Sequence, residues 1–397
     1  MFCAQRCLII NLIVNSNCSA LSAWFNSLTR IVSAMKTLRS VILSAIVKGG
    51  LIMSLLAPSA MAETFNDHWV SPLTTYQFQS QADSQSQSQS QSQSQSQILP
   101  QSQFAPTLNL SHDFSAAEQE TITQWLTHNT QSISALYGEF PIATPKFEVS
   151  LATHGSGPVP WGEVMREPVE GVRFYISRPL NLAAMNHDWT AAHEMSHLLI
   201  PYPGDTNLWL SEGLATWYQN IARINAGDVT ETEGWQAFVD GIARGRANNQ
   251  HSDITLDRLS RDMRRTHSYM RVYWSGAAYF LHMEYQLQQA NLNLLAVLKR
   301  FNQCCRYGQK EWQGAAMVLA FDNLLAQLQP ASQTASLVPS LPKAPFLMSY
   351  RQWQASLTIT ELAREYAWFG VRVDKGRVSL DSAAPYVTRR SALYRLK

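Results

Sequence analysis

The hydrophobic period of the chain changes near Asn186, and this change constrains the fold more than any other feature. Before it, short segments alternate apolar and polar residues, as strands do, and after it apolar residues recur every three to four positions, as in amphipathic helices. The expected strands are 107–110, 147–151 and 171–178. The expected helices are 115–137, 188–200, 207–225, 231–246, 255–266, 269–289, 291–302, 312–328 and 350–368. This pattern predicts an α+β fold, with a small mixed sheet that includes an edge strand, followed by a mainly helical lobe.

Charge and length exclude several classes of protein. The chain has 397 residues, 46% of them hydrophobic, which is enough for a packed core in two or three domains. Its 31 Lys and Arg residues nearly balance 29 Asp and Glu residues. All the acidic residues follow residue 62, so the remainder of the chain is slightly acidic. No binding of nucleic acid is therefore expected.

The first 62 residues are predicted to be an export signal region. A basic stretch from Met35 to Arg39 precedes an apolar run and a small-residue cleavage pattern ending at Ala62, so 35–62 has the features of a signal peptide. Residues 1–34 are either the product of a misplaced start codon or a first apolar segment. A membrane anchor is the alternative, but Lys48 interrupts the apolar run. We expect an exported protein, periplasmic or secreted, without a stable membrane span after cleavage.

Composition divides the rest of the chain into three parts. Residues 63–103 contain almost pure Ser-Gln alternation at 79–97, which has nothing to bury and indicates a linker. Residues 104–330 are expected to form the main folded domain. After a Pro-rich break, 331–397 is the expected C-terminal helical extension, packed on that domain.

The five cysteines do not predict a disulfide framework. Three lie in the leader, and the remaining two, Cys304 and Cys305, are neighbours. Adjacent cysteines seldom bridge without strain, so we expect the fold not to depend on disulfides.

The helix at 188–200 contains His193-Glu194-Met195-Ser196-His197. A spacing of four places both imidazoles on one helical face, one turn apart, where each can offer a nitrogen to one tetrahedral Zn²⁺. Glu194 then lies beside the metal, where it could take a proton from water. The alternative is a pair of core histidines on an ordinary amphipathic helix.

Glu212 is the candidate third ligand. It follows His197 by fifteen residues, in a second helix that a Pro-Gly turn can fold back onto the first. Its neighbours Leu210, Leu214 and Ala215 are apolar, so a carboxylate here would be buried at high cost without a cation. An exposed surface Glu is the alternative. The pattern predicts one zinc ion per chain with an open fourth position.

These motifs resemble those of a known family. His193-Glu194-x-x-His197, followed by Trp-Leu-Ser-Glu212-Gly-Leu-Ala-Thr, is similar to the gluzincin metallopeptidases, most closely the aminopeptidase N family and its glycyl-aminopeptidase-like relatives. The resemblance covers about Gly171 to Met283 and implies a zincin-like catalytic domain. Tyr273, in Val-Tyr-Trp-Ser-Gly-Ala, matches the Tyr that stabilises the oxyanion in that family, and Tyr269 is its rival one turn earlier.

The chain departs from the family pattern in three places. The gap between His197 and Glu212 is shorter than in aminopeptidase N, and Ser275 replaces the usual Lys. The G-x-M-E-N segment, which binds a substrate's amino group in that family, is absent, and Trp161 to Met165 is only weakly similar to it. Without that carboxylate, cleavage of blocked or internal peptide bonds is slightly favoured over aminopeptidase action. Glu163 or Glu170 could supply the missing anchor.

The predicted function is zinc-dependent hydrolysis of peptide bonds in peptides or proteins, with Glu194 as base and Tyr273 as oxyanion donor. The substrate backbone is expected to pair with an edge strand formed by Gly171, Val172, Arg173 and Phe174. His154, His187 and His267 lack metal spacing and are expected to be structural or exposed. The alternative function is a noncatalytic, metal-stabilised binding module of the cell envelope.

Overall fold

The strands form one five-stranded mixed sheet. The computed structural model describes residues 74–77, 104–111, 113–308, 311–328 and 341–394. The export signal region and the Ser-Gln tract lie outside these residues. The strand order is β1-β2-β3-β5-β4, with β2, β3 and β5 parallel and the two outer strands antiparallel to their neighbours. The strands are β1 (Thr74–Gln77), β2 (Thr107–Leu110), β3 (Lys146–Leu151), β4 (Trp161–Met165) and β5 (Gly171–Ile176).

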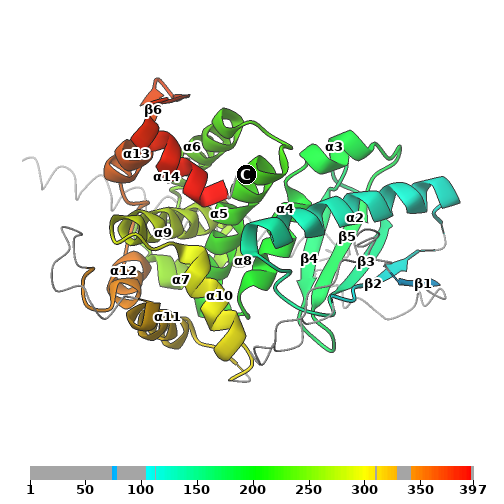
Figure 1. Cartoon of the computed structure of the whole chain (residues 1–397), viewed down its shortest axis with the longest axis horizontal. Coiled ribbons are helices and arrows are strands. Elements are labelled where there is room, and N and C mark those ends of the chain that lie inside the picture. The colour runs from blue at the N-terminus through cyan, green and yellow to red at the C-terminus, as the bar shows by residue number, and fades with distance from the viewer. Residues whose placement is uncertain (1–73, 78–103, 112, 309–310, 329–340, 395–397) are drawn as a thin grey trace, which may run out of the picture. The chain divides into compact units, whose positions relative to one another are not determined.

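Two helices cover the buried face of the sheet. Helix α2 (Ala116–Tyr137) begins at a capping box, in which Ser115 and Glu118 bond each other's backbone N–H groups. Its Trp125 packs edge-on against Phe174 of β5 at 5.0 Å between ring centroids. Helix α4 (Thr190–Ser196) contacts β4, β5 and α2 on one side and α5 (Leu208–Ala226) on the other, as Figure 1 shows. The short helix α4 therefore joins the sheet to the helical lobe.

The helical lobe is built around α5 and α9 (Tyr269–Gln289). The two helices meet where glycines face each other, since a Cβ on Gly276 would lie 2.6 Å from the Cα of Gly213. The other described helices are α3 (Leu182–His187), α6 (Glu231–Ala247), α7 (Leu256–Arg261), α8 (Met263–Thr266), α10 (Leu294–Cys304), α11 (Gly314–Leu328), α12 (Pro345–Gln354), α13 (Ala363–Phe369) and α14 (Ala384–Tyr394). The α+β plan is confirmed.

The C-terminal part of the chain differs from the expected helical extension. The hairpin of β6 (Val371–Asp374) and β7 (Arg377–Leu380) lies between α13 and α14 and packs against α6. Its strands have four residues each. The predicted single helix 350–368 is two helices, α12 and α13, and all the described residues belong to one compact unit. The predicted domain boundary near residue 330 stays a prediction.

The adjacent cysteines do bridge, contrary to expectation. Cys304 and Cys305 form a disulfide with an S–S distance of 2.05 Å where α10 ends and the chain turns. Cys304 is the last residue of α10 and Cys305 is its C-cap, where the backbone leaves helical dihedral angles. The bridge ties no distant segments together.

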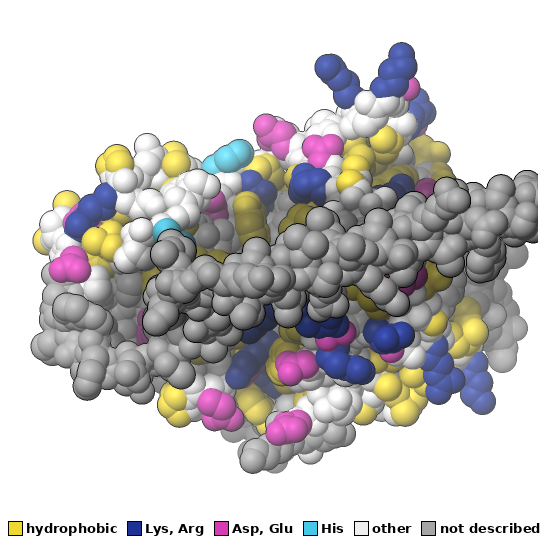
Figure 2. Space-filling view, turned by 180° about the vertical axis from the view of Figure 1, so that it is seen from behind, with side chains coloured by type: hydrophobic (Ala, Val, Ile, Leu, Met, Phe, Trp, Pro, Cys, Tyr) yellow, Lys and Arg dark blue, Asp and Glu magenta, His cyan; other side chains and the backbone are white. Residues whose placement is uncertain are grey.

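The described surface has mixed charge. Figure 2 shows Lys and Arg side chains interspersed with Asp and Glu side chains over one face. Within the described residues, no helix is both long and apolar enough to cross a membrane.

Candidate metal centre

His193, His197 and Glu212 come together between α4 and α5. Their ligand atoms lie within 4.8 Å of one another, and they are the one group of at least three potential ligands among the described residues. Oε2 of Glu212 lies 3.3 Å from Nε2 of His193 and 3.4 Å from Nε2 of His197. Ligand atoms bonded to one tetrahedral zinc ion at ~2.0–2.1 Å are about 3.3 Å apart. The geometry therefore fits a zinc ion.

The outer nitrogens of both histidines are held by α5. Nδ1 of His193 lies 2.8 Å from Oε1 of Gln219, and Nδ1 of His197 lies 3.0 Å from Oγ of Ser211. Because an amide oxygen can only accept, Nδ1 of His193 carries the proton, and the Nε2 lone pair of a neutral His193 faces Glu212. Two acceptors this close need a cation between them, either a proton or a metal ion.

Burial and charge act in opposite directions on Glu212. Burial raises its pKa, but the charge of His197 and hydrogen bonds from His193 and His197 outweigh this effect, so the pKa lies well below its usual range. Glu212 is therefore a permanent carboxylate. This is the ionisation state that a metal ligand requires.

Glu194 lies beside the three candidate ligands with its pKa raised. Burial is the largest cause, the charges of His193 and His197 oppose it, and the charges of Glu212 and Glu163 add to it. Its Cγ would be 2.6 Å from a Cβ on Gly162, so β4 passes directly over this side chain. A buried carboxylate with a raised pKa is suited to accept and return a proton.

Tyr273 of α9 also reaches the centre. Its ring stacks on the ring of His193, with 5.9 Å between centroids and 15° between planes. Burial, the charges of Glu212 and Glu194, and a hydrogen bond to Glu212 raise the pKa of Tyr273, so the phenol stays protonated and can donate. The rival Tyr269 has its nearest ring contact with His267 instead, at 6.3 Å.

The prediction that Gly171 to Phe174 form an edge strand is wrong. These residues belong to β5, which pairs with β3 on one side and with β4 on the other, so its backbone groups are already bonded. Of the described strands, β4 holds the edge position next to α4. Its sequence, Trp-Gly-Glu-Val-Met, contains a glycine and little alternation, so the pattern did not identify it as a strand.

Both candidate anchors for a substrate amine are already paired. Glu163 bonds Arg173 at 3.0 Å, and alternation along β4 places it on the face opposite to Gly162. Glu170 binds Arg166 at 3.0 Å and Arg306 at 2.9 Å. The spare histidines lie outside the ligand group, and His187 bonds the carbonyl oxygen of Asp228 through Nδ1.

Sequence reasoning missed the residues that hold the centre from outside. Gln219 lies two helical turns after Glu212 on α5, and that spacing is a signal for a shared face. Arg166 and Arg306 carried no such signal. Arg166 donates to the carbonyl oxygen of His197 at 3.1 Å, and Arg306 donates to that of Leu198 at 2.7 Å.

Comparisons with known proteins give distant structural neighbours. The sequence matches no family model and no curated protein. An aminopeptidase N family protein from Idiomarina loihiensis is similar at 15% identity and a TM-score of 0.48, over 77% of this chain and 50% of that one. An M1 zinc metallopeptidase from Deinococcus radiodurans is similar at 14% identity and a TM-score of 0.39, over 67% of this chain and 52% of that one.

A third neighbour is a variant of a two-domain M1 zinc metallopeptidase bound to L-arginine, at 15% identity and a TM-score of 0.36, over 65% of this chain and 50% of that one. The chain thus spans about half the length of these proteins. Because all three scores lie below 0.5, the assignment of the site rests on the residues described above.

Proposed function

We propose that this chain is a zinc-dependent peptidase with a gluzincin ligand set in a zincin-like domain, carrying one zinc ion per chain. The observation that carries the proposal is the convergence of two Nε2 atoms on one oxygen of Glu212, with Glu194 beside them under β4. Zinc held by His193, His197 and Glu212 would supply Lewis acidity and make a water molecule more acidic.

The protein's own groups account for the proton transfers. Glu194 takes a proton from the attacking water and returns it to the leaving amine. The hydroxyl of Tyr273 donates a hydrogen bond to the developing oxyanion. The free edge of β4 replaces β5 as the strand that pairs with the substrate backbone, because it crosses directly over Glu194.

The second candidate, a noncatalytic metal-stabilised binding module, is less well supported. Structural zinc sites fill all four positions with protein ligands. This centre has three candidate ligands among the described residues, and it keeps a carboxylate and a phenol beside them.

We also propose cleavage of internal or blocked peptide bonds rather than removal of N-terminal residues. The pairing of Glu163 with Arg173 and of Glu170 with two arginines supports this proposal, because neither carboxylate is left for a substrate amine. Hydrolysis of a free aminoacyl substrate and of its N-acetylated twin should be compared. A strong preference for the free amine would contradict the proposal.

Export is proposed from the signal peptide at 35–62, which lies outside the described residues. The Cys304–Cys305 disulfide supports this proposal, since disulfides persist mainly in oxidising compartments. Mass spectrometry of the protein from the periplasm or medium should give a chain that begins at Glu63.

The central experiment is Glu194→Gln. The variant should keep about one equivalent of zinc by metal analysis and lose hydrolysis of a peptide library by about 10³-fold or more, because the base is gone while the ligands stay. Glu120→Gln, at an exposed position of α2 away from the centre, is the control and should keep most of the activity. Near-normal turnover in Glu194→Gln would refute the mechanism, and a zinc-loaded wild type without any hydrolysis would favour the binding module.

A further inference from the structure

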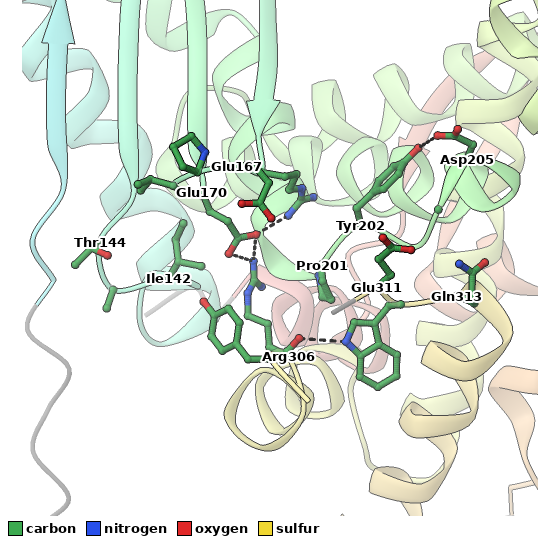
Figure 3. Close-up of a pocket in the computed structure, with 17 residues that line it drawn as sticks. Ile142, Thr144, Glu167, Glu170, Pro201, Tyr202, Asp205, Arg306, Glu311 and Gln313 are labelled. Carbon is green, nitrogen blue, oxygen red and sulfur yellow. Dashed lines mark hydrogen bonds and ion pairs between the residues drawn. The ribbon is translucent and has the colours of Figure 1, made fainter. Parts of the chain in front are cut away.

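A cavity of about 720 Å³ lies beside the loop that follows α4, where Pro201 and Tyr202 line it. Three loops line most of it: the hairpin turn after β4, the loop between α4 and α5, and the loop between α10 and α11. Figure 3 shows residues of all three loops facing one another, with Arg306 bonded both to Glu170 and, through its carbonyl oxygen, to Trp312. Arg166, at the wall, donates to the carbonyl oxygen of His197 at 3.1 Å and of Ile200 at 3.2 Å. The cavity is therefore attached to the turn that carries a metal ligand.

The donors of the two guanidinium groups in the wall are already bonded to acceptors of the protein. Arg306 is buried and donates to Leu198, Asn302 and both oxygens of Glu170. Arg166 donates to the same carboxylate and to the carbonyls above. These bonds fix the floor of the cavity and leave its arginines engaged, so the cavity is not suited to an anion.

The remaining charged groups of the lining are acidic. Glu167, Asp205 and Glu311 are exposed side chains, and within the described residues no Lys or Arg forms an ion pair with any of them. Tyr202, which donates to Asp205, and Tyr307 add two aromatic rings to the wall. Carboxylates next to aromatic faces are the surroundings that a Lys or Arg side chain or an ammonium group prefers.

The edge strand connects the cavity to the reacting bond. Gly162 lies over Glu194, and Arg166 follows directly after the end of β4. Four residues of strand span about 13 Å at ~3.3 Å per residue. A peptide paired with β4 therefore brings a residue about four positions from its cleaved bond to the cavity.

We propose that this cavity is a substrate subsite that binds a cationic group about four residues from the cleaved bond. The inference rests on the proposed peptidase function and deepens it. It assigns as substrate an extended peptide that carries a positive charge at that distance, and it makes Glu311 a specificity-determining residue.

The test uses N-acetylated decapeptides with one Lys moved through each position, and norleucine in its place as the neutral control. Mass spectrometry locates the cleaved bond, so that kcat/KM can be sorted by the distance of the Lys from it. Wild type should prefer Lys over norleucine by about fivefold at three to five residues from the bond, on one side only, which is the size of a partly exposed ion pair.

Glu311→Lys should remove or reverse this preference, and Glu311→Gln should reduce it. Glu120→Lys is the matched control, because Glu120 is exposed and lies far from the cavity. Tyr137 is at the end of α2 nearer the cavity, and Glu120 lies about 25 Å from Tyr137 along the helix. Glu120→Lys makes the same change in net charge and should keep the preference. A preference that survives Glu311→Lys, or no preference for Lys at any of these distances, would overturn the proposal.

Two further experiments are needed. The first distinguishes a Lys side chain from an N-terminal amine as the cationic group, and the second distinguishes the subsite proposal from the proposed peptidase function. The first uses a peptide without Lys whose free N-terminal amine lies at the favoured distance from the cleaved bond. If this peptide is preferred as strongly as the Lys peptide, the subsite also accepts chain termini; if it is not, the subsite selects side chains. Fluorescence anisotropy of the labelled peptides with Glu194→Gln measures binding without turnover. Lys-selective binding there, with no hydrolysis by wild type, would support the subsite and refute the peptidase.

Discussion

Two carboxylates at the centre show how environment assigns different roles to similar groups. Glu194 and Glu212 are both largely buried, yet burial raises the pKa of Glu194 while two imidazoles hold that of Glu212 low. Both are glutamate carboxyls with the same ordinary pKa. The sequence could therefore distinguish the candidate base from the candidate ligand only through the spacing of neighbouring residues. The bonds of Gln219 and Ser211 to the two histidines then orient the rings toward Glu212.

Tyr273→Phe should lower kcat by ~10²-fold or more with little change in KM, because an oxyanion donor acts mainly in the transition state. Steady-state kinetics on one peptide are enough to see this split. Tyr269→Phe is the matched control, one turn away on α9, and should be nearly silent. The opposite result would show that the hydroxyl of Tyr269 reaches the oxyanion instead.

Glu284 gives a prediction about pH and stability away from the centre. It is buried in α9 and accepts hydrogen bonds from the backbone N–H of Leu294 at 2.9 Å and from Gln288 at 3.1 Å. Burial raises its pKa to about 7, with those bonds opposing the rise. The folded chain thus binds more protons than the unfolded chain between the ordinary pKa and 7, and the free energy of unfolding falls as pH rises through this window.

Glu284→Gln should remove this pH dependence. The difference in free energy of unfolding, variant minus wild type, should be about 2 kcal/mol more positive at pH 8 than at pH 5. Urea unfolding at the two pH values measures the difference. An equal effect of the substitution at both values would contradict the raised pKa.

At the scale of elements, the close contact of α5 with α9 positions the centre. Gly276 and Gly213 face each other, Glu212 precedes Gly213, and Tyr273 lies one turn before Gly276. A glycine at position 276 permits this close approach of the two helices. The partner helix could not be identified from sequence, because a glycine does not indicate which surface approaches it.

Gly276→Ala should therefore disturb both fold and site. The new Cβ would lie 1.9 Å from the carbonyl oxygen of Trp209, so the helices must separate, at a cost of about 1–3 kcal/mol in the free energy of unfolding. Zinc affinity, measured by competition with a chelator, should fall as well. Gly234→Ala is the control, since its Cβ would meet Ile224 at the α5–α6 contact, and it should lower stability without changing zinc affinity.

The elements with a clear period were predicted well, and those without one were not. The predicted helix 269–289 coincides with α9 and the predicted strand 107–110 with β2. Strand β4, helix α3 and the β6–β7 hairpin were missed: β4 contains a glycine and hardly alternates, and α3 has six residues, fewer than two helical turns. The missed β4 is the strand that crosses over Glu194.

At the scale of the whole molecule, the C-terminal segment is part of the packed helical lobe. Arg390 of α14 is buried and bonds Glu231 of α6 at 2.8 Å, and the hydroxyl of Tyr394 accepts from Trp235 at 2.6 Å. These contacts join residues about 160 positions apart in the chain.

Removal of residues 382–397 should destabilise the entire described unit. We expect a loss of at least about 3 kcal/mol, because buried Leu393 and Tyr394 are removed and the ion pair of Glu231 is broken. Thermal unfolding by circular dichroism should show one transition at a lower temperature. Arg372→Ala, which breaks only an exposed pair with Asp381, is the control, and an unchanged transition in the truncated chain would mean that this segment is a separate extension.

The sequence by itself determined the α+β plan, most of the long helices and the candidate ligand set. It could do so because each depends on local spacing: a period of 3.6 makes a helical face, and a spacing of four places two imidazoles one turn apart. The tertiary structure alone decided which strand has the free edge, which side chains orient the imidazoles, and that Arg166, Glu170 and Arg306 form the floor of the cavity. Those features join residues far apart in the chain, and their contacts depend on how the elements pack, which no local pattern encodes.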